Sequence, residues 1–157
     1  MAPVDAQRVT GEREVLVVAL AAFPGRLAVA AQAVASDLAA GGRAVPAGEW
    51  GPPEVVRHLI AVETDVHQAR LADLAATDDP HWDWTEPGPW PGEPGCSLAG
   101  LLDRFARLRA ATLATVAALD EAGWRRTGTH TRLGRWDVAG LLQNAVDHDE
   151  DHLAGLR

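Results

Sequence analysis

The sequence has no lysine and no tyrosine, and all 14 of its basic residues are arginine. Isoleucine and asparagine occur once each, as Ile60 and Asn144, whereas alanine, glycine, proline and arginine are abundant. This bias is that of a GC-rich bacterial genome, so the missing lysine carries no functional information. The chemistry of the chain has to come from its other polar residues.

Positive charge is also scarce. The 157 residues include 22 acidic and 14 basic side chains, which gives a formal net charge of −8 at pH 7. Such a surface repels nucleic-acid phosphates and anionic lipid headgroups, which argues against nucleic-acid and membrane-surface partners. No unbroken apolar run reaches the ~18–20 residues that a membrane-spanning helix needs, so no bilayer span is expected.

Cysteine occurs once, at Cys96, so the chain cannot form an internal disulfide. Residues 1–10 show no basic stretch followed by an apolar one, and a secretory signal is not expected. Both features favour a cytoplasmic protein. The length fits a single domain over residues 1–157, with residues 1–10 as a loose N-terminal segment.

Strand patterns are absent, whereas four segments show apolar residues at helical spacing. They cover approximately residues 11–40, 52–76, 97–122 and 137–156. Pro24 predicts a kink in the first segment, or a division of it into two pieces. Four amphipathic helices in one small domain predict an all-α four-helix bundle, in which each helix buries its apolar stripe against its neighbours.

The segment between the second and third helices is of a different kind. Residues 78–97 contain five prolines, three glycines and three tryptophans, so no regular element is expected there. A loop of this length in a compact domain is often a lid or a binding loop. Trp82, Trp84 and Trp90 could close a site or pack across one end of the bundle. Cys96 lies in no recognisable nucleophile motif and is interpreted as an incidental exposed thiol.

Two histidines four residues apart, His148 and His152, lie on one face of the last helix. They continue the apolar row of Leu141 and Ala145, so they are expected to face the bundle interior. Buried imidazoles need partners, and a divalent metal ion supplies one partner to both rings. His58, on the inward row of the second helix, is the best third ligand. Three imidazoles leave coordination positions open, as in catalytic sites.

The spacing also allows a simpler interpretation, because a histidine pair four residues apart arises by chance in many helices. On spacing alone, a metal site and a pair of ordinary core histidines are equally supported. The acidic residues around the pair are expected to form a solvated outer face of the helix: Asp147, Asp149, Glu150 and Asp151.

The remaining histidines show less pattern. His67 is predicted to lie on the side of the second helix opposite to His58 and therefore to face solvent. His81 and His130 are placed in loops without a partner. Two polar residues one or two helical turns from the histidine ligands, Asp65 and Asn144, are predicted to line the pocket beside the metal.

Three passages together resemble the DinB-like family of bacterial four-helix-bundle proteins: the stretch from Trp50 to Leu59, the stretch from Gly134 to Leu142, and the stretch from His148 to Leu153. The resemblance implies an up-down-down-up bundle and a divalent metal ion held by three histidines. At the matching positions these are His58, His148 and His152. In place of the Ser or Thr helix cap common in the family, this chain has Gly51-Pro52-Pro53.

Some members of that family use mycothiol or bacillithiol in S-transfer or isomerisation. The first functional hypothesis is therefore a metal-dependent enzyme that transfers a low-molecular-weight thiol to a small electrophile. A metal-dependent hydrolase is the alternative, and a non-catalytic metal- or ligand-binding module or a structural dimer is a third. Zinc and nickel are the expected metals, and a homodimer through the faces of the bundle stays open. The substrate, the native metal and the general base are not specified by the sequence.

Overall fold

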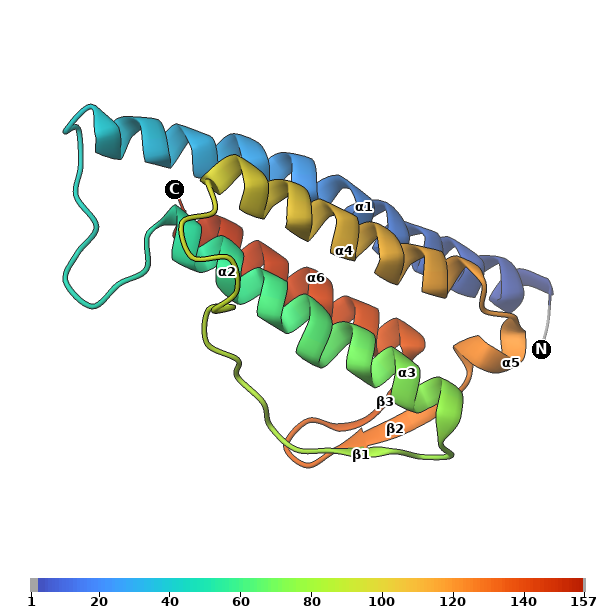
Figure 1. Cartoon of the computed structure of the whole chain (residues 1–157). Coiled ribbons are helices and arrows are strands. Elements are labelled where there is room, and N and C mark those ends of the chain that lie inside the picture. The colour runs from blue at the N-terminus through green and yellow to red at the C-terminus, as the bar shows by residue number, and fades with distance from the viewer. Residues whose placement is uncertain (1–2, 157) are drawn as a thin grey trace.

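The computed structural model describes residues 3–156, with side chains described from Arg8 onward. The helices are α1 (Pro3–Ala39), α2 (Pro52–Val62), the π-helical η1 (Glu63–Gln68), α3 (Ala69–Ala76), α4 (Leu98–Ala117), α5 (Glu121–Trp124) and α6 (Val138–Gly155). The strands are β1 (His81–Trp82), β2 (Thr127–His130) and β3 (Gly134–Asp137). α2, η1 and α3 follow one another without a break, so four long helical units form the bundle (Figure 1).

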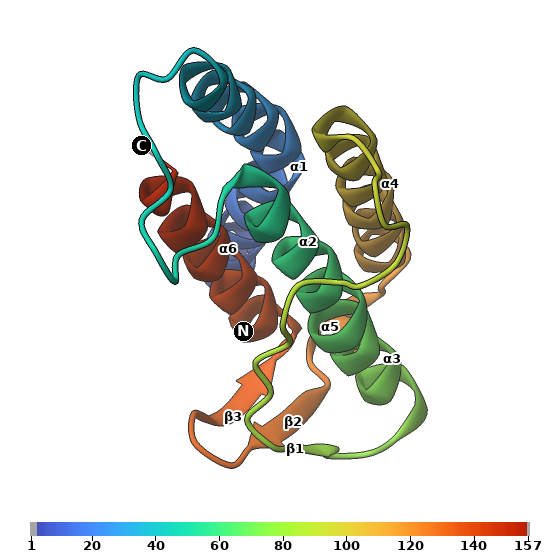
Figure 2. The same cartoon turned by 60° about the vertical axis from the view of Figure 1, so that its left-hand side comes forward.

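The topology of the bundle is up-down-down-up, as the resemblance implies. α1 and α6 run in one direction, whereas the α2–η1–α3 unit and α4 run in the other (Figure 1). Two consecutive parallel helices cannot be joined by a short turn, so the chain has to return along the bundle. The segment after β1 does this, passing along the outer side of the α2–η1–α3 unit to the start of α4 (Figure 2).

The core follows from the apolar stripe of each helix. On α1 the fully buried positions recur every three or four residues, as a helical stripe requires, and they are Leu16, Leu20, Phe23, Leu27 and Ala31. This stripe packs against α4 and α6. Phe23 meets Phe105 of α4 edge-on, with the ring centroids 5.9 Å apart. The stripe confirms the amphipathic pattern seen in the sequence.

The first helix is longer than predicted. It begins at Pro3, so residues 3–10, expected to form a loose segment, continue the helix, while residues 1–2 lie outside the described residues. Proline is tolerated at a helix start, where its missing N–H has no helical acceptor, and the residues that follow include strong helix formers such as Ala and Arg. Pro24 lies inside one continuous helix and does not divide it into two pieces.

α1 also bears on the expectation that no segment could span a membrane. By length and composition, Arg8–Ala39 is the one helix in the described part of the chain apolar enough to do so, and its 18-residue window has a mean hydropathy of 1.8. The difference arises because an average over such a window tolerates the charge of Arg26, whereas an unbroken run does not. In this fold α1 buries its stripe in the bundle core, which is the arrangement of a bundle helix.

A small three-stranded sheet covers one end of the bundle, although the sequence predicted no strand. β2 pairs with β1 in parallel and with β3 in antiparallel orientation. Strands of two to four residues are too short to show a readable alternation, so periodicity missed them. Trp82 of β1 lies against Gly128 of β2, where an added Cβ would come within 2.3 Å of the indole ring. The sheet therefore ties the long loop to the segment that enters α6.

Candidate metal centre

The second helix directs His58 into the bundle. Gly51 is its N-cap and Pro52 its first residue, a position where the absent proline N–H costs nothing. The His58 side chain is buried, and its Nδ1 lies 2.7 Å from the carbonyl oxygen of Pro87 in the long loop. A carbonyl only accepts hydrogen bonds, so Nδ1 carries the proton and donates it. The other ring nitrogen, Nε2, therefore presents a lone pair.

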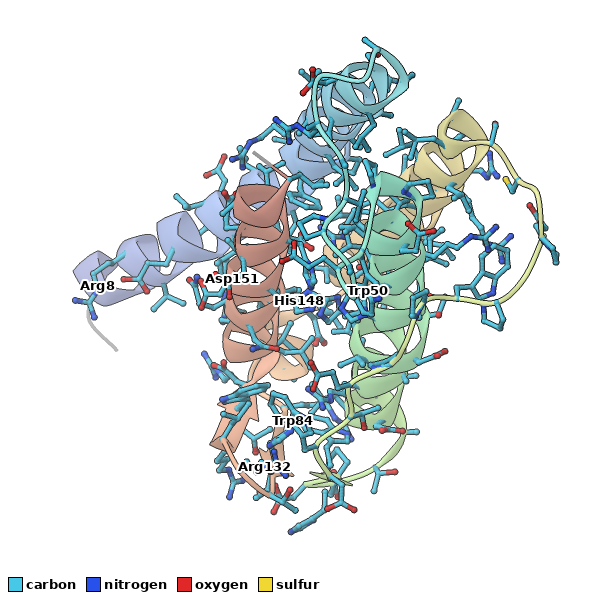
Figure 3. The ribbon with its side chains drawn as sticks, turned by 90° about the vertical axis from the view of Figure 1, so that its left-hand side faces the viewer. Arg8, Trp50, Trp84, Arg132, His148 and Asp151 are labelled. Atoms are coloured by element: carbon cyan, nitrogen blue, oxygen red, sulfur yellow. The ribbon has the colours of Figure 1, made fainter. Side chains whose placement is uncertain are left out.

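The last helix supplies the other two imidazoles. Asp137 caps α6 by accepting a hydrogen bond from the backbone N–H of Gly140 at 2.8 Å. His148 and His152 then lie one turn apart on the face that points toward α2, and Figure 3 shows His148 in that space beside Trp50. The Nε2 atom of His148 lies 3.3 Å from Nε2 of His58 and 3.2 Å from Nε2 of His152.

The three imidazoles fit a divalent cation. One ligand nitrogen from each ring lies within 4.8 Å of the other two. The Nε2 atom of His58 carries a lone pair and cannot donate a hydrogen bond to the other two imidazoles. Hydrogen bonds among the three imidazoles therefore cannot satisfy all three Nε2 atoms. A cation that accepts three lone pairs resolves this, and three imidazoles suit Zn, Ni, Fe or Cu and leave positions open for water or substrate.

The protonation states are those that ligation requires. Burial, together with the neighbouring rings of His152, His67 and His58, lowers the pKa of His148 to about 3. Burial also lowers the pKa of His58 and of His152 below the ordinary value. All three rings are therefore neutral at neutral pH, which is the form that binds a metal ion.

A π-helical turn brings a fourth histidine to the site. On a regular α-helix the nine positions from His58 to His67 amount to about two and a half turns, which places His67 on the opposite side and predicts that it faces solvent. The extra residue in the turn of η1 rotates His67 back by about 100°. The structure accordingly buries His67, with its ring 6.3 Å from that of His148 and its Nδ1 3.1 Å from Glu63 Oε2. The outward prediction for His67 is wrong.

Behind these rings lies a fully buried ionic network centred on Arg109 of α4. Its guanidinium donates to both carboxylate oxygens of Glu63, at 3.0 and 2.9 Å, and to both of Asp149, at 2.7 and 3.3 Å. Thr112 Oγ1 donates a further hydrogen bond to Glu63. Asp149 belongs to this network and is buried, so its assignment to a solvated outer face is wrong.

Each buried charge in the network has a partner of opposite charge. Although burial by itself would raise the pKa of Glu63, the hydrogen bond from His67 and the charge of Arg109 hold it at about 2. Burial raises the pKa of Asp149, against the opposing effect of Arg109. The two carboxylates raise the pKa of Arg109 above its ordinary value in spite of its burial. The backbones of η1, α4 and α6 are thereby tied together behind the histidines.

The low pKa of Glu63 predicts how stability depends on pH. Because this pKa falls from 4.5 to about 2 on folding, the stabilisation is complete above pH 4.5 and is lost as the pH falls toward 2. We expect Glu63→Gln to lower the free energy of unfolding by roughly 2 kcal/mol at pH 7 and by progressively less below pH 4.5. Urea unfolding at several pH values measures this, with the exposed Glu12→Gln as control. A stability difference that does not change with pH would contradict the assignment.

A cavity of about 230 Å³ opens on the free side of the three histidines. Asn144 lines it. Asp65 does not: it is exposed, accepts a hydrogen bond from Thr64 Oγ1, and is absent from the cavity wall, because the widened π turn carries it away from the inward face. The prediction for Asp65 is therefore wrong. The walls further include two acidic residues, Glu86 and Asp151.

The long loop forms one wall of this cavity through residues 84–87. Trp84 is 47% exposed there, in the position of a lid residue. Trp82 instead packs at the bundle end, where its indole N–H donates to Asp73 at 2.9 Å. Trp90 lies outside the cavity, with the guanidinium groups of Arg57 and Arg104 near its ring. Trp84 therefore has the position expected of a lid residue, whereas Trp82 packs at the end of the bundle.

The family model of the DinB superfamily matches residues 11–155. The chain belongs to the DinB superfamily. Among solved structures, this DinB-superfamily chain resembles YfiT from Bacillus subtilis, described as a probable metal-dependent hydrolase with an unusual four-helix bundle topology. The TM-score is 0.69 at 18% sequence identity, over 92% of this chain and 83% of that one, which shows a common fold. No curated protein matches the chain.

Proposed function

We propose that this DinB-superfamily protein is a metal-dependent enzyme whose divalent ion is held by His58, His148 and His152. The observation that carries the proposal is the convergence of three neutral imidazoles, from two helices distant in sequence, at the wall of a cavity. A structural site would be closed by a fourth protein ligand, whereas here the remaining side opens on a space of about 230 Å³. That volume suits a small-molecule substrate.

A divalent ion in this position supplies Lewis acidity and lowers the pKa of a water molecule or thiol at the site, so that the anion is available at neutral pH. The residues of the chain do the rest. The Pro87 carbonyl fixes the tautomer and orientation of His58. Glu86 and Asp151 are the carboxylates in the cavity wall that could take up the released proton. The Arg109 network keeps the helix that bears His148 in place.

Hydrolysis of a small ester, amide or related electrophile is the first reaction to consider, since it needs only water as the nucleophile. The fold likeness to YfiT, itself described as a probable metal-dependent hydrolase, supports it. S-transfer from mycothiol or bacillithiol is the second. Its support is the size of the cavity, about 230 Å³, which exceeds what a water nucleophile alone would need, with the half-exposed Trp50 and Trp84 in its wall.

The experiment compares metal-free protein with protein reloaded with zinc or nickel. Both forms are assayed with aryl esters and anilides, and with mycothiol or bacillithiol plus a halogenated aromatic electrophile. Metal-dependent product from the esters or anilides supports the hydrolase, and thiol-dependent conjugate supports the transferase. Metal binding without turnover in any arm would contradict the enzyme and favour a binding module. Chelation that only lowers the melting temperature would favour a structural ion.

A further inference from the structure

A second group of polar residues lines the cavity away from the three histidines, at the end formed by the sheet, where His130 ends β2. The sequence placed His130 in a loop without a partner, but the ring is 1% exposed and lines the cavity. Its Nδ1 accepts hydrogen bonds from the backbone N–H groups of Arg132 and Leu133, at 3.0 and 3.2 Å. Backbone N–H groups only donate, so Nδ1 carries a lone pair and the neutral ring holds its proton on Nε2.

Two tryptophans fix the orientation of the His130 ring. Trp136 of β3 stacks on it, with the centroids 5.6 Å apart at an interplanar angle of 26°. Trp84 of the loop meets it edge-on, at 6.0 Å and 87°. Yet the buried Nε2 has no hydrogen-bond partner in the part of the chain that the structure describes. A buried N–H held rigidly without an acceptor is costly, and such groups mark places where a ligand supplies the acceptor.

A buried cation lies at the same end of the cavity. The Arg70 side chain is 7% exposed, lines the cavity, and places its guanidinium 5.5 Å from the centre of the Trp82 ring. Among the described residues it forms no salt bridge, and the nearby Asp73 accepts the indole N–H of Trp82. Burial lowers the pKa of Arg70, against the opposing effect of the Asp73 charge. Arg70 and His130 thus present donors to one space.

The charges around His130 keep it a neutral donor. Burial lowers its pKa, and the cations of Arg70 and Arg132 lower it further, against the weaker effect of Asp83. At the other end of the cavity, beside the histidine cluster, the acidic Glu86 and Asp151 repel an anion. In the metal-free protein, an anionic group that enters the cavity is therefore directed to the sheet end.

We propose that the sheet end of the cavity binds a carboxylate of the substrate, with the guanidinium of Arg70 and the Nε2–H of His130 as donors. One formal cation and one neutral donor match a monoanion, and guanidinium binds planar carboxylates in two-point fashion. Val62, Val66 and Leu133 line the wall and suit a short apolar body. The substrate class is then a small carboxylic acid with an apolar middle. That its reactive group reaches the three histidines rests on the proposed function.

Benzoate is the probe, and its binding to the full-length protein is measured by calorimetry after metal removal, so that the ion cannot be its ligand. We expect benzoate to bind and Arg70→Gln to weaken it about tenfold or more, since a charge-assisted pair is lost. Arg125→Gln is the matched control: Arg125 is exposed, pairs with Glu121 and is outside the cavity wall, so binding should persist. Benzamide should bind more weakly than benzoate.

A second measurement does not depend on a variant that has to fold. Nitrogen-15 spectra of the histidine rings should show His130 protonated on Nε2 and not on Nδ1, with the Nε2–H proton shifting when benzoate is added. Protonation on Nδ1, equal binding of benzamide, an unchanged affinity in Arg70→Gln, or tighter binding of inorganic phosphate than of benzoate would each overturn the proposal. None of these results depends on metal, so failure here is separate from failure of the proposed metal-dependent activity.

Discussion

Replacing His148 with alanine is expected to abolish metal binding. Its Nε2 lies 3.3 Å from Nε2 of His58 and 3.2 Å from Nε2 of His152. Without His148, only two imidazoles, from two different helices, remain to bind the ion. We expect about one zinc or nickel ion per chain in the unmodified protein after reloading, and little above background in His148→Ala. A competing chelator should show an affinity at least about a hundredfold lower, because even outer-shell losses cost 10–100-fold.

His81→Ala is the control for this change, because His81 is an exposed histidine whose Nδ1 lies 3.0 Å from the Asp79 carbonyl oxygen, outside the histidine cluster. Its metal content should equal that of the unmodified protein. Far-ultraviolet circular dichroism separates lost ligation from lost folding. If His148→Ala retained the same metal content and affinity, the three histidines would not form the site and the proposed function would fail.

Replacing Arg109 with methionine should destabilise the protein more than any surface change. The guanidinium is the common partner of two buried carboxylates, and without it Asp149 and Glu63 lose their salt bridges in the core, although Glu63 keeps its contacts with Thr112 and His67. Breaking such a buried network on one side costs about 3–5 kcal/mol of unfolding free energy. The loss includes contacts with aromatic rings, since the guanidinium carbon lies 5.1 Å from the Phe105 ring and 5.8 Å from that of Phe23. Denaturant unfolding at constant metal content measures it.

Two comparisons make this prediction specific. Arg107→Met removes the exposed pair of Arg107 with Asp103, whose side chains are 66% and 67% exposed, and should cost about 0.5 kcal/mol or less. The triple variant Arg109→Met, Glu63→Gln, Asp149→Asn removes the unpaired charges as well and should recover much of the stability. A triple variant no more stable than Arg109→Met would show that packing, and not the stranded carboxylates, dominates the loss.

Much of the fold could be predicted from the sequence because the helices and their buried faces depend on the local spacing of apolar residues. The apolar stripe of α1 and the inward row of α6 recur with the helical period, and each predicts a buried face without knowledge of its partner. The same periodicity placed His148 and His152 inside, and His58 on the matching face of α2. The direction of the helices rested on the family resemblance, which also matched the three histidines.

The buried network was missed for a reason that is equally physical. Arg109 follows Phe105 on the apolar row of α4 and precedes Thr112, so a charged residue at an inward position was the available signal. Its partners, however, are 46 and 40 positions away in the chain, and no local pattern pairs them. Asp149 lies among other acidic residues in the sequence and was therefore expected on the surface, whereas its side chain points toward α4.

By itself, the sequence determined the helices, their buried faces and the inward direction of three histidines, because these follow from which residues repeat at helical spacing. Only the tertiary structure decided which other groups meet them. The π turn of η1, which a single extra residue per turn creates, brought His67 in and turned Asp65 out. The sheet, made of strands too short for periodicity, carried His130 to the cavity beside Arg70. Both depend on contacts between segments far apart in the chain.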